Sequence, residues 1–246
     1  MSVAARLLEL AHTDERAVLF TVVEGAGQGE KLLVLLERDG ETVGDAPASL
    51  AALAPEIRRN GMQEHEGMKV FAEVYGPPPR LVVVGAVDTA EALCGAAKLL
   101  GWHTVCIDAR AAFATPERIP SADELIVEWP DVGLARIEPD HGTAIVVLTH
   151  DLKFDVPALQ AALRTDAFYV SAIGSRKTQA KRREELVAAG LTVAELDRIH
   201  GPAGLDLGAD SPAETAVSIL SEALAVRAGR DGTPLKTAPG RIHVEA

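Results

Sequence analysis

The chain has 246 residues and a formal net charge of -12, and 48% of its residues are hydrophobic although only 4% are aromatic. This length fits one large domain, or one domain with a smaller companion, around a core of Ala, Val, Leu and Ile. The excess of acidic residues excludes nucleic acid as an expected partner, because nucleic-acid binding needs a basic face.

The two cysteines, Cys94 and Cys106, fit neither a CxxC motif nor a disulfide framework. Cys106 falls in a predicted strand and is expected to be a small buried hydrophobe. The N-terminus shows no charged-then-apolar leader, and no apolar run reaches membrane-spanning length. These features predict a cytoplasmic protein that does not insert into a membrane.

Residues 1–75 predict a small α+β N-terminal domain that packs on the rest of the chain. The Pro-rich segment 76–80, Gly76-Pro77-Pro78-Pro79-Arg80, is expected to be a stiff extended linker, because three consecutive prolines exclude a helix or a central strand. The predicted elements before it are a helix over 2–11, strands at Ala17–Val23, Lys31–Glu37 and Lys69–Tyr75, and a helix at Leu50–Arg59.

Residues 81–228 alternate between apolar strands and helices, which predicts an α/β domain with a parallel sheet covered on both faces. Residues 229–246 are expected to form a loosely ordered tail. The strands are predicted at Leu81–Gly85, Thr104–Asp108, Glu124–Val127, Ala144–Thr149 and Phe168–Ile173, and the helices at Thr89–Leu100, Val156–Leu163, Lys177–Ala189 and from Ser211 to about Ala228.

The turn Gly174-Ser175-Arg176-Lys177 joins a buried strand to a basic helix. A helix start offers unpaired N–H groups and partial positive charge, so this turn is a candidate phosphate site. The alternative is a solvated first turn whose basic residues face water. Lys181-Arg182-Arg183, further along, is interpreted as a solvated helix face because two glutamates follow it.

The segment Gly85-Ala86-Val87-Asp88-Thr89-Ala90 follows the first strand of the alternating region, where dinucleotide-binding folds place G-x-G-x-x-G/A. Gly85 and Ala86 are candidate cofactor-binding residues. Val87 replaces the middle glycine and Asp88 adds a negative charge, so a tight turn without a ligand is the alternative.

Asp108 ends the second strand, at the position where an acidic residue binds a ribose diol. Arg110 beside it could pair with a phosphate or with a surface carboxylate. Asp at a strand end is also a common turn or helix cap.

Thr149-His150-Asp151 follows the fourth strand and is expected to face the same crevice. His150 and Asp151 are the candidate catalytic residues, and Thr149 and His150 are also candidate cofactor ligands. His150, Asp151 and Asp155 could alternatively hold a metal, or Asp151 could simply cap the next helix; a resident metal is not predicted.

The loop Gly201–Ser211 contains Gly204 and Gly208 and precedes a well-capped helix. A loop of this length is typical of functional or mobile segments, so both glycines are candidate cofactor-binding residues. A plain connection is the alternative.

Taken together, these segments resemble the XdhC/CoxI family over roughly residues 80–226, as a divergent member. The resemblance implies a Rossmann-like domain and an accessory role for a molybdenum hydroxylase, such as xanthine dehydrogenase or carbon monoxide dehydrogenase. The motifs are Asp108-Ala109-Arg110, Glu117-Arg118-Ile119-Pro120, Thr149-His150-Asp151, Ala172-Ile173-Gly174-Ser175-Arg176-Lys177, Arg198-Ile199-His200-Gly201-Pro202-Ala203-Gly204 and Ser211-Pro212-Ala213-Glu214.

The implied ligand is molybdenum cofactor, a molybdopterin that is in some cases extended to a dinucleotide. The implied partners are the apoenzyme and the proteins that sulfurate the cofactor or transfer a nucleotide to it. Two features depart from the family: Val87 and Asp88 in the phosphate turn, and an N-terminal region without the family's cysteine.

Two other functions remain open from the sequence. One is an NAD(P)- or nucleotide-dependent oxidoreductase, and the other is a scaffold that works through protein contacts alone. A homodimer is also considered, because the Ala-rich helices 89–100 and 213–228 could pack against a second copy.

Overall fold

The computed structural model describes residues 2–13, 15–36 and 40–238, which divide into two compact units. One unit comprises Met1–Pro77 with the segment from Thr233 onward, and the other comprises Pro78–Gly232. The division between the units therefore falls within the proline segment. Of the tail expected to be loosely ordered, residues 239–246 lie outside the described part of the chain.

Within the described residues, the first unit is an antiparallel sheet in the order β3-β2-β1-β5-β4. Inward-facing residues of β1 alternate between two small cores: Val18 and Phe20 pack toward the helical turn η1, and Ala17 and Leu19 pack toward helix α1. The elements are α1 (Val3–Leu10), β1 (Ala17–Glu24), β2 (Lys31–Leu35), β3 (Thr42–Gly44), η1 (Ala48–Glu56), β4 (Gly61–His65) and β5 (Met68–Tyr75).

The first unit differs from the sequence prediction at three elements: η1, β3 and β4. The helix predicted at Leu50–Arg59 is a 3-10 helix, η1, that contains Pro55, and a proline cannot donate the next backbone hydrogen bond. The strands β3 and β4 were not predicted, because neither has a clear apolar alternation. Glu37, the predicted end of the second strand, lies outside the described residues.

The second unit contains a parallel sheet in the order β11-β10-β9-β6-β7-β8. Its inner strands are buried on both faces, so successive residues of β6 enter opposite cores: Leu81 and Val83 one, Val82 and Val84 the other. The strands are β6 (Arg80–Val84), β7 (His103–Ile107), β8 (Glu124–Ile126), β9 (Thr143–Val147), β10 (Tyr169–Ala172) and β11 (Ile199–His200).

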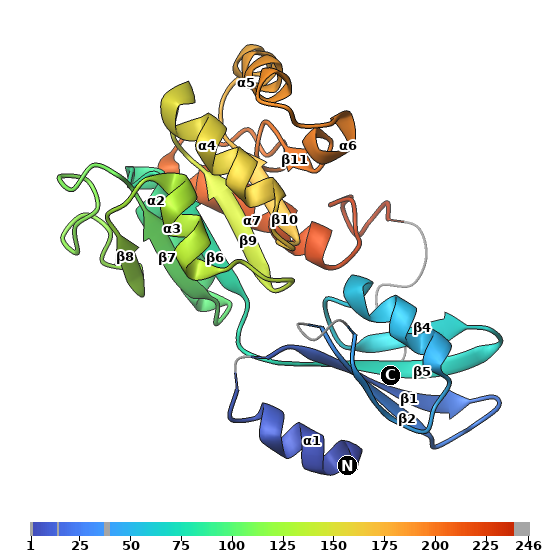
Figure 1. The fold of residues 1–246 in the computed structure, drawn as a ribbon. Helices are drawn as coiled ribbons and strands as arrows, with labels where there is room; N and C mark the ends of the chain where they lie inside the picture. The colour runs from blue at the N-terminus through green and yellow to red at the C-terminus, as the bar shows by residue number, and fades with distance from the viewer. Residues whose placement is uncertain (1, 14, 37–39, 239–246) are drawn as a thin grey trace. The chain divides into compact units, whose positions relative to one another are not determined.

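Helices cover both faces of this sheet (Figure 1). Helices α2 and α7 pack together on one face, whereas α3, α4 and α5 contribute to the core on the other face. The fold is therefore the α/β Rossmann-like arrangement that the sequence predicts. The helices are α2 (Asp88–Leu99), α3 (Pro130–Ile137), α4 (Leu152–Leu163), α5 (Arg176–Ala188), α6 (Val193–Leu196) and α7 (Pro212–Arg227).

Strands β6 and β9 lie side by side, but the chain leaves them in opposite directions. From β6 it continues to β7 and β8, and from β9 it continues to β10 and β11. This is a topological switch point, and open α/β sheets bind ligands outside the carboxyl ends of the strands at such a point. Within the described ranges, no helix combines the length and apolar character needed to cross a membrane.

Candidate functional site

The residues singled out from the sequence follow five strands of the parallel sheet, and they therefore lie along its carboxyl edge. They come from β6, β7, β9, β10 and β11 in turn. In that order they are Gly85 and Ala86; Asp108 and Arg110; Thr149 and His150; Gly174, Ser175, Arg176 and Lys177; and Gly204 and Gly208.

The turn after β6 lies against the end of β9. Gly85 has a φ of +109°, and a Cβ atom there would lie 2.8 Å from Cγ2 of Thr149. A glycine is therefore needed both for the backbone angle and for the close approach. Val87 is extended, with a φ of -109°, and its side chain packs against the core beneath α2. A valine at this place is thus used in packing.

Asp108 connects the turn after β6 with the loop after β7. It is buried, and its Oδ2 accepts hydrogen bonds from the Ala86 amide at 2.9 Å and from Nη2 of Arg110 at 2.7 Å. Its Oδ1 accepts from the amide and Nε of Arg110, both at 2.9 Å. Burial opposes ionisation of Asp108, but these bonds outweigh it and lower the pKa. The carboxylate therefore orients Arg110, whose side chain remains 38% exposed.

The end of β9 is held by a buried ion pair that the sequence analysis missed. Arg182 and Asp155 are 1% and 0% exposed, and Nε of Arg182 lies 2.6 Å from Oδ2 of Asp155. Arg182 also donates to the carbonyl oxygens of Thr149 and Ile173, and the Thr149 hydroxyl donates to Asp155. The prediction of a solvated face was wrong for Arg182.

The spacing along α5 could have revealed this role. Thr178, Arg182 and Leu186 recur every four residues, so they share one face of the helix. Leu186 belongs to the core, and Thr178 lies next to Gly174. The buried guanidinium therefore lies on the inward face of α5 and joins the ends of β9 and β10.

His150 and Asp151 lie at the start of α4 and are both exposed. Oδ1 of Asp151 accepts from the Lys153 amide at 3.0 Å and so caps the helix. Asp155 is engaged by Thr149 and Arg182. Among the described residues, no group of three or more His, Cys, Asp or Glu side chains is arranged to hold a metal ion.

The turn after β10 presents cations to solvent. Gly174 has a φ of +119°, and Ser175 caps α5 because its Oγ accepts from the Thr178 amide at 3.2 Å. Arg176 and Lys177 are exposed in the first turn of α5. The arrangement joins a helix N-terminus with two positive side chains, which suits an anionic group.

The loop after β11 is anchored on α7 through Glu222. Oε2 of Glu222 accepts from the Gly204 amide at 2.7 Å and from the Tyr169 hydroxyl at 2.5 Å, and its Oε1 lies 3.2 Å from Nδ1 of His200. Burial raises the pKa of Glu222, but the bonds from His200, Tyr169 and Gly204 lower it overall. Gly204 thus belongs to the anchored part of the loop, whereas Gly208 is exposed.

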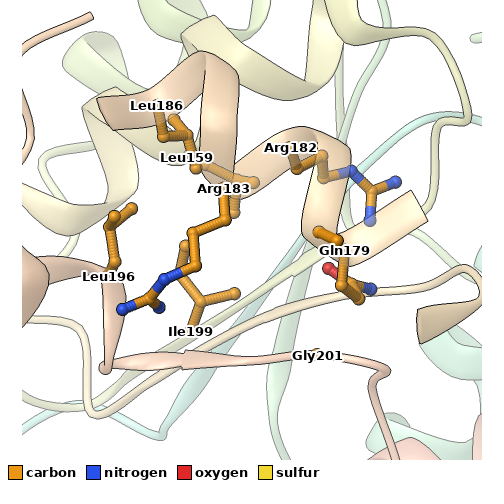
Figure 2. A pocket seen from close by; sticks show the side chains of 9 residues that line it. Leu159, Gln179, Arg182, Arg183, Leu186, Leu196, Ile199 and Gly201 are labelled. Carbon is orange, nitrogen blue, oxygen red and sulfur yellow. The ribbon is translucent and has the colours of Figure 1, made fainter. Parts of the chain in front are cut away.

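A separate cavity of about 170 Å³ lies on the α4–α5 side of the sheet. Figure 2 shows that the side chains of Arg182 and Arg183 point in different directions, with the guanidinium of Arg183 toward Leu196 and Ile199. The remaining lining is mostly apolar, with contributions from Leu159, Leu186, Leu196 and Ile199. Gly201, which begins the candidate loop Gly201–Ser211, also lines the cavity, but the candidate cofactor-binding and catalytic residues do not.

Comparison with known proteins places the second unit in a family. The model of the XdhC Rossmann domain family matches residues 81–223. A Bacillus subtilis protein named as a probable xanthine dehydrogenase component is 28% identical over 158 residues, which are 64% of this chain and 46% of that protein. The molybdenum cofactor insertion chaperone PaoD of Escherichia coli is 29% identical over 157 residues, which are 64% of this chain and 43% of the chaperone.

An uncharacterized Escherichia coli protein, YqeB, is 29% identical over 67% of this chain and 30% of its own length, so the matches span less than half of each of these relatives. A crystal structure described as a xanthine dehydrogenase from Bacillus halodurans has the same fold, with a TM-score of 0.63 and 22% identity over 95% of this chain and 70% of that one. The order of the parallel strands, the turns at their carboxyl edge and the match over residues 81–223 lead to one conclusion: this chain belongs to the XdhC Rossmann domain family.

Proposed function

We propose that the chain is a maturation factor for a molybdenum hydroxylase, which binds molybdenum cofactor and delivers it to the apoenzyme. Family membership supports this role, as do relatives named for xanthine dehydrogenase and for insertion of the cofactor. The cofactor is a cargo here, so the protein needs reversible binding and protein contacts more than a catalytic group.

The turn after β10 carries the proposal. The cargo is a pterin with a phosphate group, and Arg176 and Lys177 are exposed at the N-terminus of a 13-residue helix. Charge-assisted hydrogen bonds to phosphate are about twice as strong as neutral ones. The close approach of Gly85 and Thr149 brings a second backbone turn to the switch point. The residues present therefore fit a ligand that carries a phosphate.

Delivery requires further partners, which we propose to be the apoenzyme and the proteins that sulfurate the cofactor or transfer a nucleotide to it. A cytoplasmic location is part of the same proposal. A homodimer is also part of the proposal. Helices α2 and α7 pack on each other within the chain, but Val217 and Leu224 on α7 stay exposed and could contact a second copy.

An oxidoreductase that uses NAD(P) or another nucleotide is the second candidate, favoured by the strand order of the sheet. In that function His150, which is exposed beside the switch point, would be the acid or base. The bonds that Asp108 already makes to Ala86 and Arg110 count against a standard ribose contact. A scaffold without a ligand is the third candidate.

Expression in a host that makes molybdenum cofactor tests these functions. The proposal expects pterin to co-purify with the full chain and to activate a molybdenum hydroxylase apoenzyme on transfer. The double variant Arg176→Ala/Lys177→Ala should retain much less pterin, whereas Lys181→Ala, which removes an exposed cation one turn further along α5, should retain the wild-type amount.

Each alternative gives a different result in the same preparation. Co-purification of a nicotinamide nucleotide without pterin would support the oxidoreductase. Full function in cells without any retained ligand, and without an effect of the double variant, would support the scaffold.

A further inference from the structure

A second group of side chains lies on the part of the carboxyl edge that β9, β6, β7 and β8 form. Only nine of the 246 residues are aromatic, yet three of them gather here, each after a different strand: Phe113 after β7, Trp129 after β8 and Phe154 after β9. Three cations interleave with them. We call this group the ring cluster, and its members are Phe113, Trp129, Phe154, Arg110, Arg118 and Lys153.

The members of the ring cluster form one continuous array. The rings of Trp129 and Phe154 lie 5.2 Å apart between centroids, and Nζ of Lys153 lies 5.0 Å from the Trp129 centroid. The guanidinium carbon of Arg110 lies 4.1 Å from the Phe113 centroid and 5.7 Å from that of Phe154. Arg110 therefore connects the rings that follow β7 and β9.

The hydrophobic core accounts for only one of the three rings, because Phe113 packs against it. Trp129 and Phe154 belong to neither core of the second unit, and Trp129 is 42% exposed. Arg110 is held in place by Asp108, because Nε and Nη2 both donate to that buried carboxylate. Trp129 and the guanidinium of Arg110 both lie close to Phe154, and each offers a flat surface of the kind on which heteroaromatic rings stack.

The charges around the ring cluster favour a ring over a simple anion. Asp108 and Asp151 both act on Arg110, and Oδ1 of Asp88 lies 3.6 Å from Nη2 of Arg118. These carboxylates offset the positive charges locally. The feature that distinguishes this surface is its flat stacking area, and the class of ligand that fits it is a planar nitrogen heterocycle.

We propose that the ring cluster binds a planar heteroaromatic ring, stacked on the exposed part of Trp129 and on the guanidinium of Arg110. This inference rests on the proposed function for the identity of its ligand, since the pterin of the cargo and the base of its nucleotide extension are both rings of this class. The turn after β10 would then hold the phosphate, and the ring cluster would hold a ring of the same molecule.

Titration of the full chain with ring compounds tests the inference. In a Trp102→Phe variant, Trp129 is the remaining tryptophan and reports binding by its fluorescence. The probes are pterin, guanosine, cytidine and inorganic phosphate, with calorimetry as the second readout. At least one ring compound should quench Trp129 and bind with a Kd below about 1 mM, whereas phosphate alone should leave its fluorescence unchanged.

Variants locate the binding. Trp129→Leu and Arg110→Met should each weaken ring binding by roughly 5- to 150-fold, the range expected for loss of one stacking contact. Arg136→Met, which removes an exposed cation of α3 outside the ring cluster, should bind as the wild type does. Circular dichroism checks that each variant keeps the fold.

The outcomes separate this inference from the proposed function. Binding of pterin alone assigns the ring cluster to the pterin, and binding of a nucleoside alone assigns it to the nucleotide extension. Absence of ring binding, or equal binding by Trp129→Leu and the wild type, would overturn the inference. If molybdenum cofactor binds equally well to Trp129→Leu and to the wild type, the inference fails and the proposed function stands. If ring compounds bind but molybdenum cofactor does not, the proposed function fails and the ring site stands.

Discussion

Nε of Arg182 lies 2.6 Å from Oδ2 of Asp155, and both side chains are almost completely buried. The same guanidinium donates to the carbonyl oxygens at the ends of β9 and β10. One side chain therefore fixes the relative position of two loops at the carboxyl edge.

Replacing Arg182 should be strongly destabilising, because it leaves the buried Asp155 without its partner. We expect Arg182→Met to lower the free energy of unfolding by about 3–5 kcal/mol, measured by denaturant unfolding of the full chain. Arg183→Met removes an exposed pair with Asp197 and should cost at most about 1 kcal/mol. Equal losses in the two variants would show that the buried pair has no special role.

Replacing Gly85 with alanine should lower the free energy of unfolding more than replacing Gly101 does. Both glycines have positive φ, but a Cβ at Gly85 would lie 2.8 Å from Thr149, whereas a Cβ at Gly101 would meet no atom within 4 Å. Gly101→Ala should therefore show only the backbone penalty of about 1–2 kcal/mol, and Gly85→Ala should exceed it. Thermal unfolding measures the difference; similar values would mean that the contact between β6 and β9 is loose.

Glu222 should make stability depend on pH in the acid range. Its pKa in the folded chain lies below the ordinary value of 4.5, so the unfolded chain binds more protons between the two values. The stabilisation is therefore present above about pH 4.5 and is lost as the pH falls through the folded pKa. The stability difference between wild type and Glu222→Gln should shrink in that window. A difference that stays constant from pH 7 down to pH 3 would contradict the role of this carboxylate.

The two thiols should be unreactive in the native protein. Cys94 and Cys106 are both 0% exposed, and burial raises the pKa of Cys94 to about 12 and that of Cys106 further. Only the thiolate is the reactive form, so alkylation at pH 8 should label neither residue until denaturant is added. Mass spectrometry of the intact chain reads the labelling. Rapid native labelling of either thiol would show that the core beneath α2 opens readily.

The sequence was sufficient for the architecture of the second unit, because β6 and β9 are apolar runs and α4, α5, α6 and α7 begin with side-chain caps. Ser211 and Glu214 form a capping box at the start of α7, and Thr192 and Glu195 form one at the start of α6; both fit the S/T-x-x-E pattern that marks a helix start. Elements without such signals were missed: α3 begins at a proline after Trp129, and β4 is a partly exposed polar strand.

The partners of the site residues could not be read from the sequence, because they depend on contacts between distant segments. Asp108 was expected to face a ribose, but it bonds its neighbour Arg110. Its bond to the Ala86 amide forms only when β6 and β7 are paired. Arg182 looked like part of a charged helical face, and only the packing of α5 on the sheet reveals its burial. The spacing of Phe113, Trp129 and Phe154 along the chain gives no sign that they meet.

Equilibrium titration of the purified chain with molybdopterin tests the central claim most directly. We predict one cofactor bound per chain, with affinity reduced in Arg176→Ala/Lys177→Ala and unchanged in Lys181→Ala. Absence of binding, or the same affinity in all three proteins, would contradict the claim that the turn after β10 grips the phosphate of this cargo.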